Sequence, residues 1–193
     1  MDDISDSSIK RNFYQLMLQK YLFILINLTL GSVLLFTYYR GVTNNTDISS
    51  KLWGNVPQYL TPYIVSSMFI AAIGYFIFTY FILCKIDYNS VKIFNRFSFS
   101  FFIIIYLLIL IPSCFWIDLS IQYIITGNLL LWKLIVLILY TVGISSIILL
   151  LSLISINPNN GSILYKLSIF GCSCFVFHTM CLDGLLWTLL FHK

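Results

Sequence analysis

The chain has 193 residues, of which 60% are hydrophobic, 18% are aromatic and 9% are charged. A mean hydropathy of +0.93 is typical of integral membrane proteins and excludes an ordinary water-soluble domain. The lysines and arginines behind the formal net charge of +4 mostly flank apolar blocks, so topology and anionic lipid headgroups explain this charge without nucleic acid. The expected partners are membrane lipids and other membrane proteins, with no nucleic acid.

Five apolar blocks are each long enough to cross a bilayer as a helix, which takes about 20 residues. Unbroken apolar runs such as 101–111 and 134–140 do not alternate with polar residues, as the strands of a membrane barrel would. The sequence therefore predicts an all-α fold, a polytopic integral membrane bundle of about five transmembrane helices. A polar N-terminal lead at 1–20 precedes a single transmembrane domain at 21–191, and the expected spans are 21–39, 63–86, 97–117, 129–156 and 163–191.

Short polar stretches connect these blocks. The 40–61 stretch is the longest, and Thr61 with Pro62 after it is typical of a helix N-cap followed by proline in the first turn. We expect an interfacial hinge at 120–128, and a tight turn at 157–162 that makes the fourth and fifth helices antiparallel neighbours.

Small and aromatic residues predict how the helices pack and where they end. Small residues on the second span (Ser67, Ala71, Gly74) and on the fourth (Gly143, Ser146) form faces that let another helix approach closely. Tryptophan and tyrosine near the ends of spans are typical anchors at the membrane interface, and here they are Tyr38, Tyr39, Trp53, Tyr59, Trp116, Trp132 and Trp187.

Lysine and arginine are distributed unevenly between the two ends of the spans. One end holds Lys10, Arg11, Lys20, Lys85, Lys92, Arg96 and Lys166, and the other holds Arg40, Lys51, Lys133 and Lys193. Cytoplasmic segments carry the excess, so this multi-pass chain is expected to have its N-terminus in the cytoplasm and its C-terminus in a lumen or outside the cell. Asn44 begins an Asn-x-Thr acceptor triplet, which this topology places where N-glycosylation occurs.

Charged residues within spans usually face the bundle interior, so they are candidates for an intramembrane polar site. Lys133 lies about 6 Å below the outer end of the fourth helix, and Asp183 lies roughly 10 to 12 Å below that of the fifth. Two interpretations are open. Lys133 and Asp183 can pair beside Asp118 in an outer polar cluster, or Lys133 can extend its ammonium group to the headgroups while Asp183 bonds to a hydroxyl.

His178 lies near the middle of the fifth span, and on an α-helix it shares a stripe with Cys174 and Cys181. No second group of histidines or cysteines completes the four ligands that zinc usually takes, so neither a metal nor another cofactor is expected. Asp183 follows His178 by five residues, which on an α-helix places them about 140° apart. The two are therefore not expected to form an acid–base pair.

The sequence contains no glutamate, no Gly-x-Ser-x-Gly motif and no serine next to a histidine, which favours a protein that is not an enzyme. The expected function is contact between its helices and lipid or protein partners. One alternative is a transporter or channel for a small solute or ion, with a polar site near Lys133, His178 and Asp183. Another is a membrane-embedded enzyme that modifies lipids.

Overall fold

The computed structural model describes residues 2–44, 46–158 and 161–191, with side chains from residue 17 onward except those of residues 46, 49 and 50. Lys193 lies outside this range. The helices are α1 (Asp2–Thr43), α2 (Thr46–Ser49), the 3-10 helix η1 (Ser50–Trp53), α3 (Thr61–Lys85), α4 (Ser100–Thr126), α5 (Leu129–Ile154), α6 (Ile163–Val176), the π-helical η2 (Phe177–Trp187) and α7 (Thr188–Leu190). Five stretches are long and apolar enough to cross a membrane: Met17–Thr43, Thr61–Lys85, Ser100–Thr126, Leu129–Ile154 and Ile163–Leu190. The predicted all-α fold is thus confirmed.

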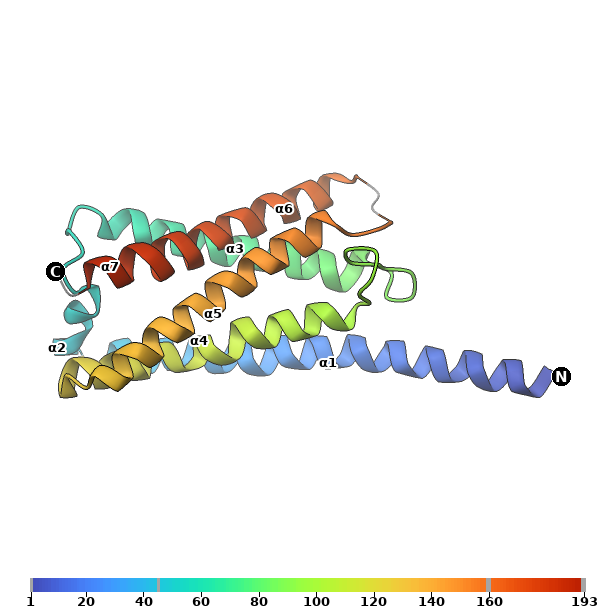
Figure 1. The fold of residues 1–193 in the computed structure, drawn as a ribbon, viewed down its shortest axis with the longest axis horizontal. Helices are drawn as coiled ribbons and strands as arrows, with labels where there is room; N and C mark the ends of the chain where they lie inside the picture. The colour runs from blue at the N-terminus through green and yellow to red at the C-terminus, as the bar shows by residue number, and fades with distance from the viewer. Residues whose placement is uncertain (1, 45, 159–160, 192–193) are drawn as a thin grey trace.

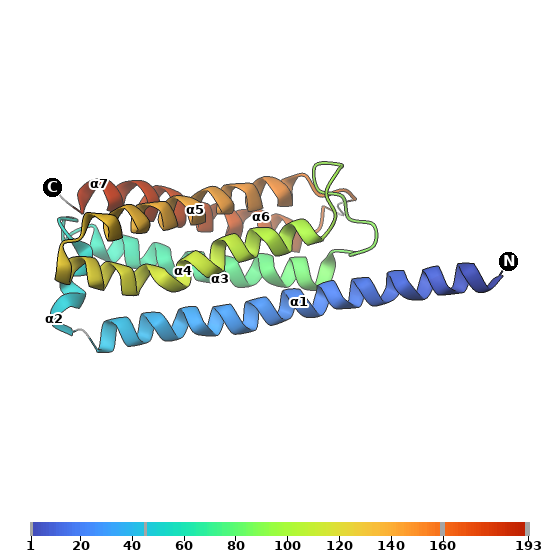
Figure 2. The same cartoon turned by 60° about the horizontal axis from the view of Figure 1, so that its bottom comes forward.

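The long helices run roughly along one axis (Figures 1 and 2). α4 packs between α1 and α5, while α3 packs mainly against α6. The N-terminal part of α1 extends beyond the other helices, and the two ends of the described chain lie at opposite ends of the bundle (Figure 1). Following the predicted topology, we call the end with the 86–99 connection the inner end, and the end with the 44–60 connection the outer end.

The predicted small-residue faces are used for packing within the chain. Gly74 of α3 and Gly171 of α6 lie so close that a Cβ atom on Gly171 would be 2.8 Å from the Cα of Gly74. A Cβ on Gly143 of α5 would likewise lie 2.7 Å from the Sδ of Met180 in η2. A side chain at Gly171 would meet backbone and push α3 and α6 apart, whereas at Gly143 the nearest atom is the end of the flexible Met180 side chain.

The structure differs from the prediction between the third and fourth spans, where α4 continues through most of the expected hinge at 120–128. The polar residues there do not end the helix, because the hydroxyls of Ser120 and Thr126 each donate to the carbonyl four residues earlier at 2.8 Å. Gly127 ends it by taking a positive φ of 65°. The side chain of Asn128 then caps α5 by accepting from the backbone N–H of Leu130 at 2.9 Å.

One helix start also differs from the prediction. Leu60, not Thr61, is the N-cap of α3, and its side chain makes no capping bond, although Pro62 lies in the first turn as expected. The lead at 1–20 is helical from Asp2 and continues directly into the first span as α1.

Candidate functional site in the outer half of the bundle

Ionisable side chains in the outer half of the bundle form two separate pairs. Arg40 and Asp118 join α1 to α4 near the outer end, and we call them the outer ion pair. His178 and Asp183 lie together within η2, and we call them the η2 pair. The structure thus assigns the two aspartates of the predicted outer polar cluster to different partners.

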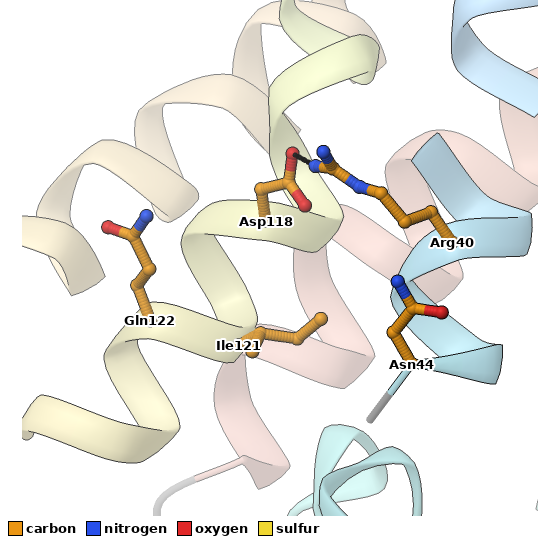
Figure 3. Close-up of a pocket in the computed structure, with 5 residues that line it drawn as sticks. All are labelled: Arg40, Asn44, Asp118, Ile121 and Gln122. Atoms are coloured by element: carbon orange, nitrogen blue, oxygen red, sulfur yellow. Dashed lines mark hydrogen bonds and ion pairs between the residues drawn. The ribbon is translucent and has the colours of Figure 1, made fainter. Parts of the chain in front are cut away.

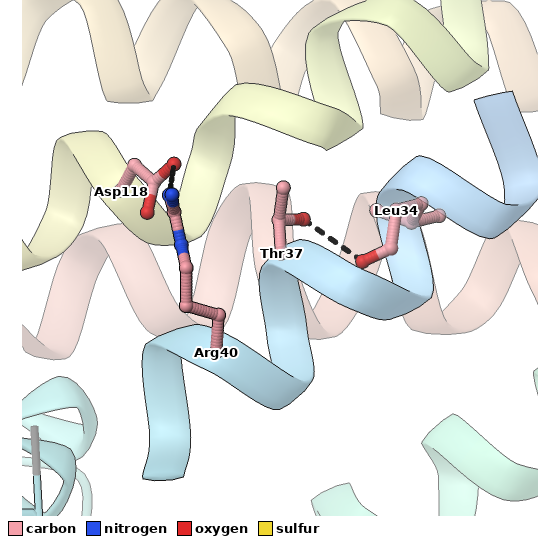
Figure 4. A network of polar contacts seen from close by, with 4 residues as sticks. All are labelled: Leu34, Thr37, Arg40 and Asp118. Atoms are coloured by element: carbon pink, nitrogen blue, oxygen red, sulfur yellow. Dashed lines mark hydrogen bonds and ion pairs between the residues drawn. The ribbon is translucent and has the colours of Figure 1, made fainter. Parts of the chain in front are cut away.

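The outer ion pair lies close to the bundle surface. Arg40 Nη2 donates to Asp118 Oδ2 at 2.5 Å, and the two side chains are 46% and 36% exposed (Figure 4). Arg40 is in the last turn of α1, where a cation interacts favourably with the helix dipole. Because water and salt screen a pair with this exposure, it contributes at most about 1 kcal/mol to stability.

A shallow cavity of about 350 Å³ adjoins the outer ion pair. Arg40, Asn44, Asp118, Ile121 and Gln122 line it, so a guanidinium, a carboxylate and two amides surround one apolar side chain (Figure 3). This volume is at the lower end of the range for small-molecule sites. Asn44, the predicted glycosylation residue, is exposed at the rim of the outer end. Glycosylation of Asn44 stays a prediction.

The η2 pair forms because the helix changes its geometry. His178 Nε2 lies 3.5 Å from Asp183 Oδ2, and the two side chains are 11% and 33% exposed. The 140° separation that we predicted assumed an α-helix, and it is wrong for this segment. In a π-helix the backbone bonds span five residues, so residues five apart lie near one another about one turn later. Such segments are rare and occur frequently at functional sites.

Other buried polar groups lie on η2 and on neighbouring helices. The hydroxyls of Thr179 in η2 and Ser146 in α5 lie 2.9 Å apart. Two buried nitrogens, His178 Nδ1 and Trp116 Nε1, have no hydrogen-bond partner among the described residues. Leaving such a group unpaired costs about 1–3 kcal/mol, so each one calls for a functional or structural explanation.

Lys133 lies apart from both pairs. Its side chain is exposed, and within the described part of the chain it takes part in no ion pair with Asp183 or Asp118. This agrees with the alternative in which its ammonium group extends to the headgroups. Of the two interpretations left open by the sequence, the pairing of Lys133 with Asp183 is not found among the described residues, where η2 places Asp183 beside His178.

The stripe predicted for Cys174, His178 and Cys181 is also altered by η2, since His178 is buried whereas Cys181 is exposed. Among the described residues, no group of three or more histidines, cysteines or acidic residues is arranged to hold a metal ion.

The residue that sequence reasoning missed is Arg40. Its position at the outer end of the first span, level with Asp118 at the outer end of the third, was the available signal.

The chain matches no protein family model, and it is similar to no curated protein and to no solved structure that was compared with it. Fold and composition together define its class. It is an all-α, multi-pass membrane protein whose five long apolar stretches each suffice to cross a bilayer.

Proposed function

We propose that the protein acts within the membrane through contacts of its helices with lipids and with helices of partner proteins, and that α1 carries the protein contact. The supporting observation is how little of α1 is covered. Within its most apolar window, 11% of the residues of α1 are buried, against 44% for α4. The large apolar side chains of α1 that are more than half exposed include Leu25, Leu28, Leu35 and Phe36.

Polar bonds at three depths hold α1 in place despite this small buried area. They are Gln19 Nε2 to Ser100 Oγ at 3.0 Å near the inner end, Tyr75 Oη to Asn27 Oδ1 at 2.6 Å within the bundle, and the outer ion pair Arg40–Asp118. These contacts lie on the side of α1 that faces the bundle. The other side, which includes the exposed residues Thr29 and Ser32, is left for another helix. Hydroxyls are groups that bond between membrane helices, and that of Thr29, which donates to the Leu25 carbonyl at 2.7 Å, can still accept.

Photo-crosslinking in native membranes tests this proposal. A photoreactive amino acid is placed at Leu28 or Leu35 on the exposed face of α1, at Ile73 on the exposed face of α3, and at the buried Ile26 of α1. We expect a discrete protein adduct from Leu28 and Leu35, and none from Ile73 or Ile26. Adducts with lipid alone at both α1 positions, or equal protein adducts from Ile73, would contradict a protein contact through α1.

A second candidate function, transport of protons or small ions, is favoured by the η2 pair. Ionisable residues within the membrane commonly belong to ion or proton pathways. Here both members of the pair lie on a π-helical segment, and His178 Nδ1 has no hydrogen-bond partner among the described residues. In reconstituted liposomes, this candidate requires a proton or ion flux that Asp183→Asn abolishes and that Lys133→Gln, a change outside the pair, leaves intact. A flux no higher than that of protein-free liposomes eliminates it.

A further inference from the structure

The connection between α3 and α4 contains a well-defined hairpin at the inner end of the bundle. Its two arms meet through two backbone bonds of 2.9 Å between Ile93 and Phe97. Two more backbone bonds, of 2.9 and 3.0 Å, join Lys92 to Asn157 in the connection between α5 and α6. We call residues 92–97 the inner hairpin. With Ile93 fully buried against the core, it is fixed to two different parts of the fold.

The tip of the inner hairpin holds aromatic side chains away from the core. Phe94 and Asn95 have φ values of 53° and 54°, a left-handed conformation that is uncommon for a residue as bulky as phenylalanine. The backbone N–H of Phe94 donates to Ser155 Oγ at 3.1 Å, which supports this conformation. As a result Phe94 and Phe97 are 44% and 40% exposed. Strained backbone of this kind is concentrated at binding and switch regions.

Cations lie at the same end of the bundle as these two rings. The guanidinium of Arg96 lies 5.7 Å from the centre of the Phe97 ring, and the side chains of Lys85, Lys92 and Lys166 are exposed at the same end of the bundle. The acidic residue of the 86–99 connection is Asp87. Its carboxylate already accepts from the hydroxyl of Ser90 at 2.7 Å and from the N–H of Asn89 at 3.0 Å. Lys92 and Arg96 outnumber this one carboxylate in the connection, and neither cation forms an ion pair among the described residues.

We propose that the inner hairpin binds the headgroups of acidic phospholipids. Because α3 ends at Lys85 and α4 begins at Ser100, the hairpin lies at headgroup depth, where aromatic side chains are stable. Phe94 and Phe97 enter the boundary of the acyl chains, and Lys92 and Arg96 contact the phosphates. A water-soluble acidic partner would account for the cations but not for the two exposed phenyl rings, whereas an acidic phospholipid accounts for both. This surface is distinct from that of α1, so the inference stands if the proposed contact through α1 fails.

Titration of the full-length protein in detergent with phosphatidylserine or phosphatidylcholine, followed by native mass spectrometry, tests the proposal. The double variant Lys92→Gln/Arg96→Gln removes two inner cations but keeps their backbone bonds. The matched control Lys51→Gln/Lys133→Gln removes two exposed cations from the outer end. We expect wild type to prefer phosphatidylserine. Each inner cation removed should lower that affinity roughly fivefold, while the control stays within about twofold of wild type.

A second variant separates the aromatic contribution from the charge. Phe94→Asn/Phe97→Ser keeps every cation, and asparagine tolerates the left-handed conformation, so affinity should fall for both lipids with little change in their ratio. Soluble glycerophosphoserine at the same concentration should not displace the lipid. Equal binding of both lipids by wild type, an equal loss in the outer control, or displacement by glycerophosphoserine would each overturn the proposal.

Discussion

The tryptophans show how an individual residue can depart from its expected role. All four (Trp53, Trp116, Trp132 and Trp187) lie in the outer half of the chain's spans or in the outer connection, and the sequence predicts that they face the membrane interface. Trp187 is instead 6% exposed, and its Nε1 donates to the carbonyl of Leu52 at 2.9 Å. It therefore fastens the outer connection to the end of the fifth span instead of anchoring the protein in lipid.

Removing the indole N–H from Trp187 and from Trp116 should have unequal effects. Trp187→Phe leaves the Leu52 carbonyl without its partner and should lower the free energy of unfolding by about 1–3 kcal/mol beyond the loss of volume. Trp116→Phe removes a similar volume, but its buried Nε1 has no partner among the described residues, so its cost should be smaller. Unfolding in mixed micelles measures both values. An equal loss in the two variants would show that volume alone decides the result.

Asp87 gives the inner connection a dependence on pH. The hydrogen bond from Ser90 and, next, the backbone N–H of Asn89 hold the pKa of the Asp87 carboxyl below its usual value. A lowered pKa stabilises the fold above the unfolded value of about 3.9, and this contribution is lost as the pH falls through the folded pKa. Amide exchange at Asn89, corrected for its intrinsic pH dependence, should therefore become faster in acid.

Asp87→Ala should make this exchange fast at every pH, whereas Asp118→Asn at the other end of the bundle should leave the transition unchanged. A transition that persists in Asp87→Ala would assign it to another group. Since Asp87 is exposed, we expect the effect to remain local to the turn.

At the scale of the helices, the crossing of α3 and α6 depends on two glycines. An added methyl group at Gly74 would meet the backbone of Gly171, which cannot move as a flexible side chain can. Gly74→Ala should therefore lower the free energy of unfolding by about 1–3 kcal/mol. Gly31→Ala in α1 is the matched control, because a Cβ there meets no heavy atom within 4 Å, and alanine is the better helix former. Equal destabilisation of both variants, measured in mixed micelles, would disprove close packing at this crossing.

The sequence predicted the helices better than it predicted their contacts. Length and apolarity identify all five spans, because a bilayer requires each backbone group to bond within its own helix. The small residues at Gly74 and Gly143 also indicate where helices approach one another. The partner of Asp183 was not predictable in this way, since an α-helical period was assumed for 163–191. The π-helical segment packs against Ser146 and Gly143 of α5, and the hydropathy pattern carries no signal for its change of helical period.

At the scale of the whole molecule, the arrangement of the five spans has a consequence for topology. The two ends of the described chain lie at opposite ends of the bundle (Figure 1), as an odd number of crossings requires. The excess of lysine and arginine at the inner end predicts that this end faces the cytoplasm. The expected topology follows from the distribution of charged residues in the sequence. The position of α1 at the edge of the bundle, in contrast, depends on individual polar contacts, which cannot be predicted from a hydropathy pattern.

Labelling of single cysteines in intact cells tests this topology. Cys84 is exposed at the inner end of α3, and Lys51 is exposed in the outer connection. One variant keeps Cys84 alone, the other carries Lys51→Cys alone, and the remaining cysteines are replaced by alanine in both. If the chain resides in the plasma membrane, a membrane-impermeant maleimide should label Lys51→Cys but reach Cys84 only after permeabilisation. If it resides in an organelle, Cys84 should react once the plasma membrane alone is opened, and Lys51→Cys should need detergent.

The opposite order in either case would show that the inner end faces away from the cytoplasm. That result would also remove the basis for placing the inner hairpin beside the acidic lipids of the cytoplasmic leaflet.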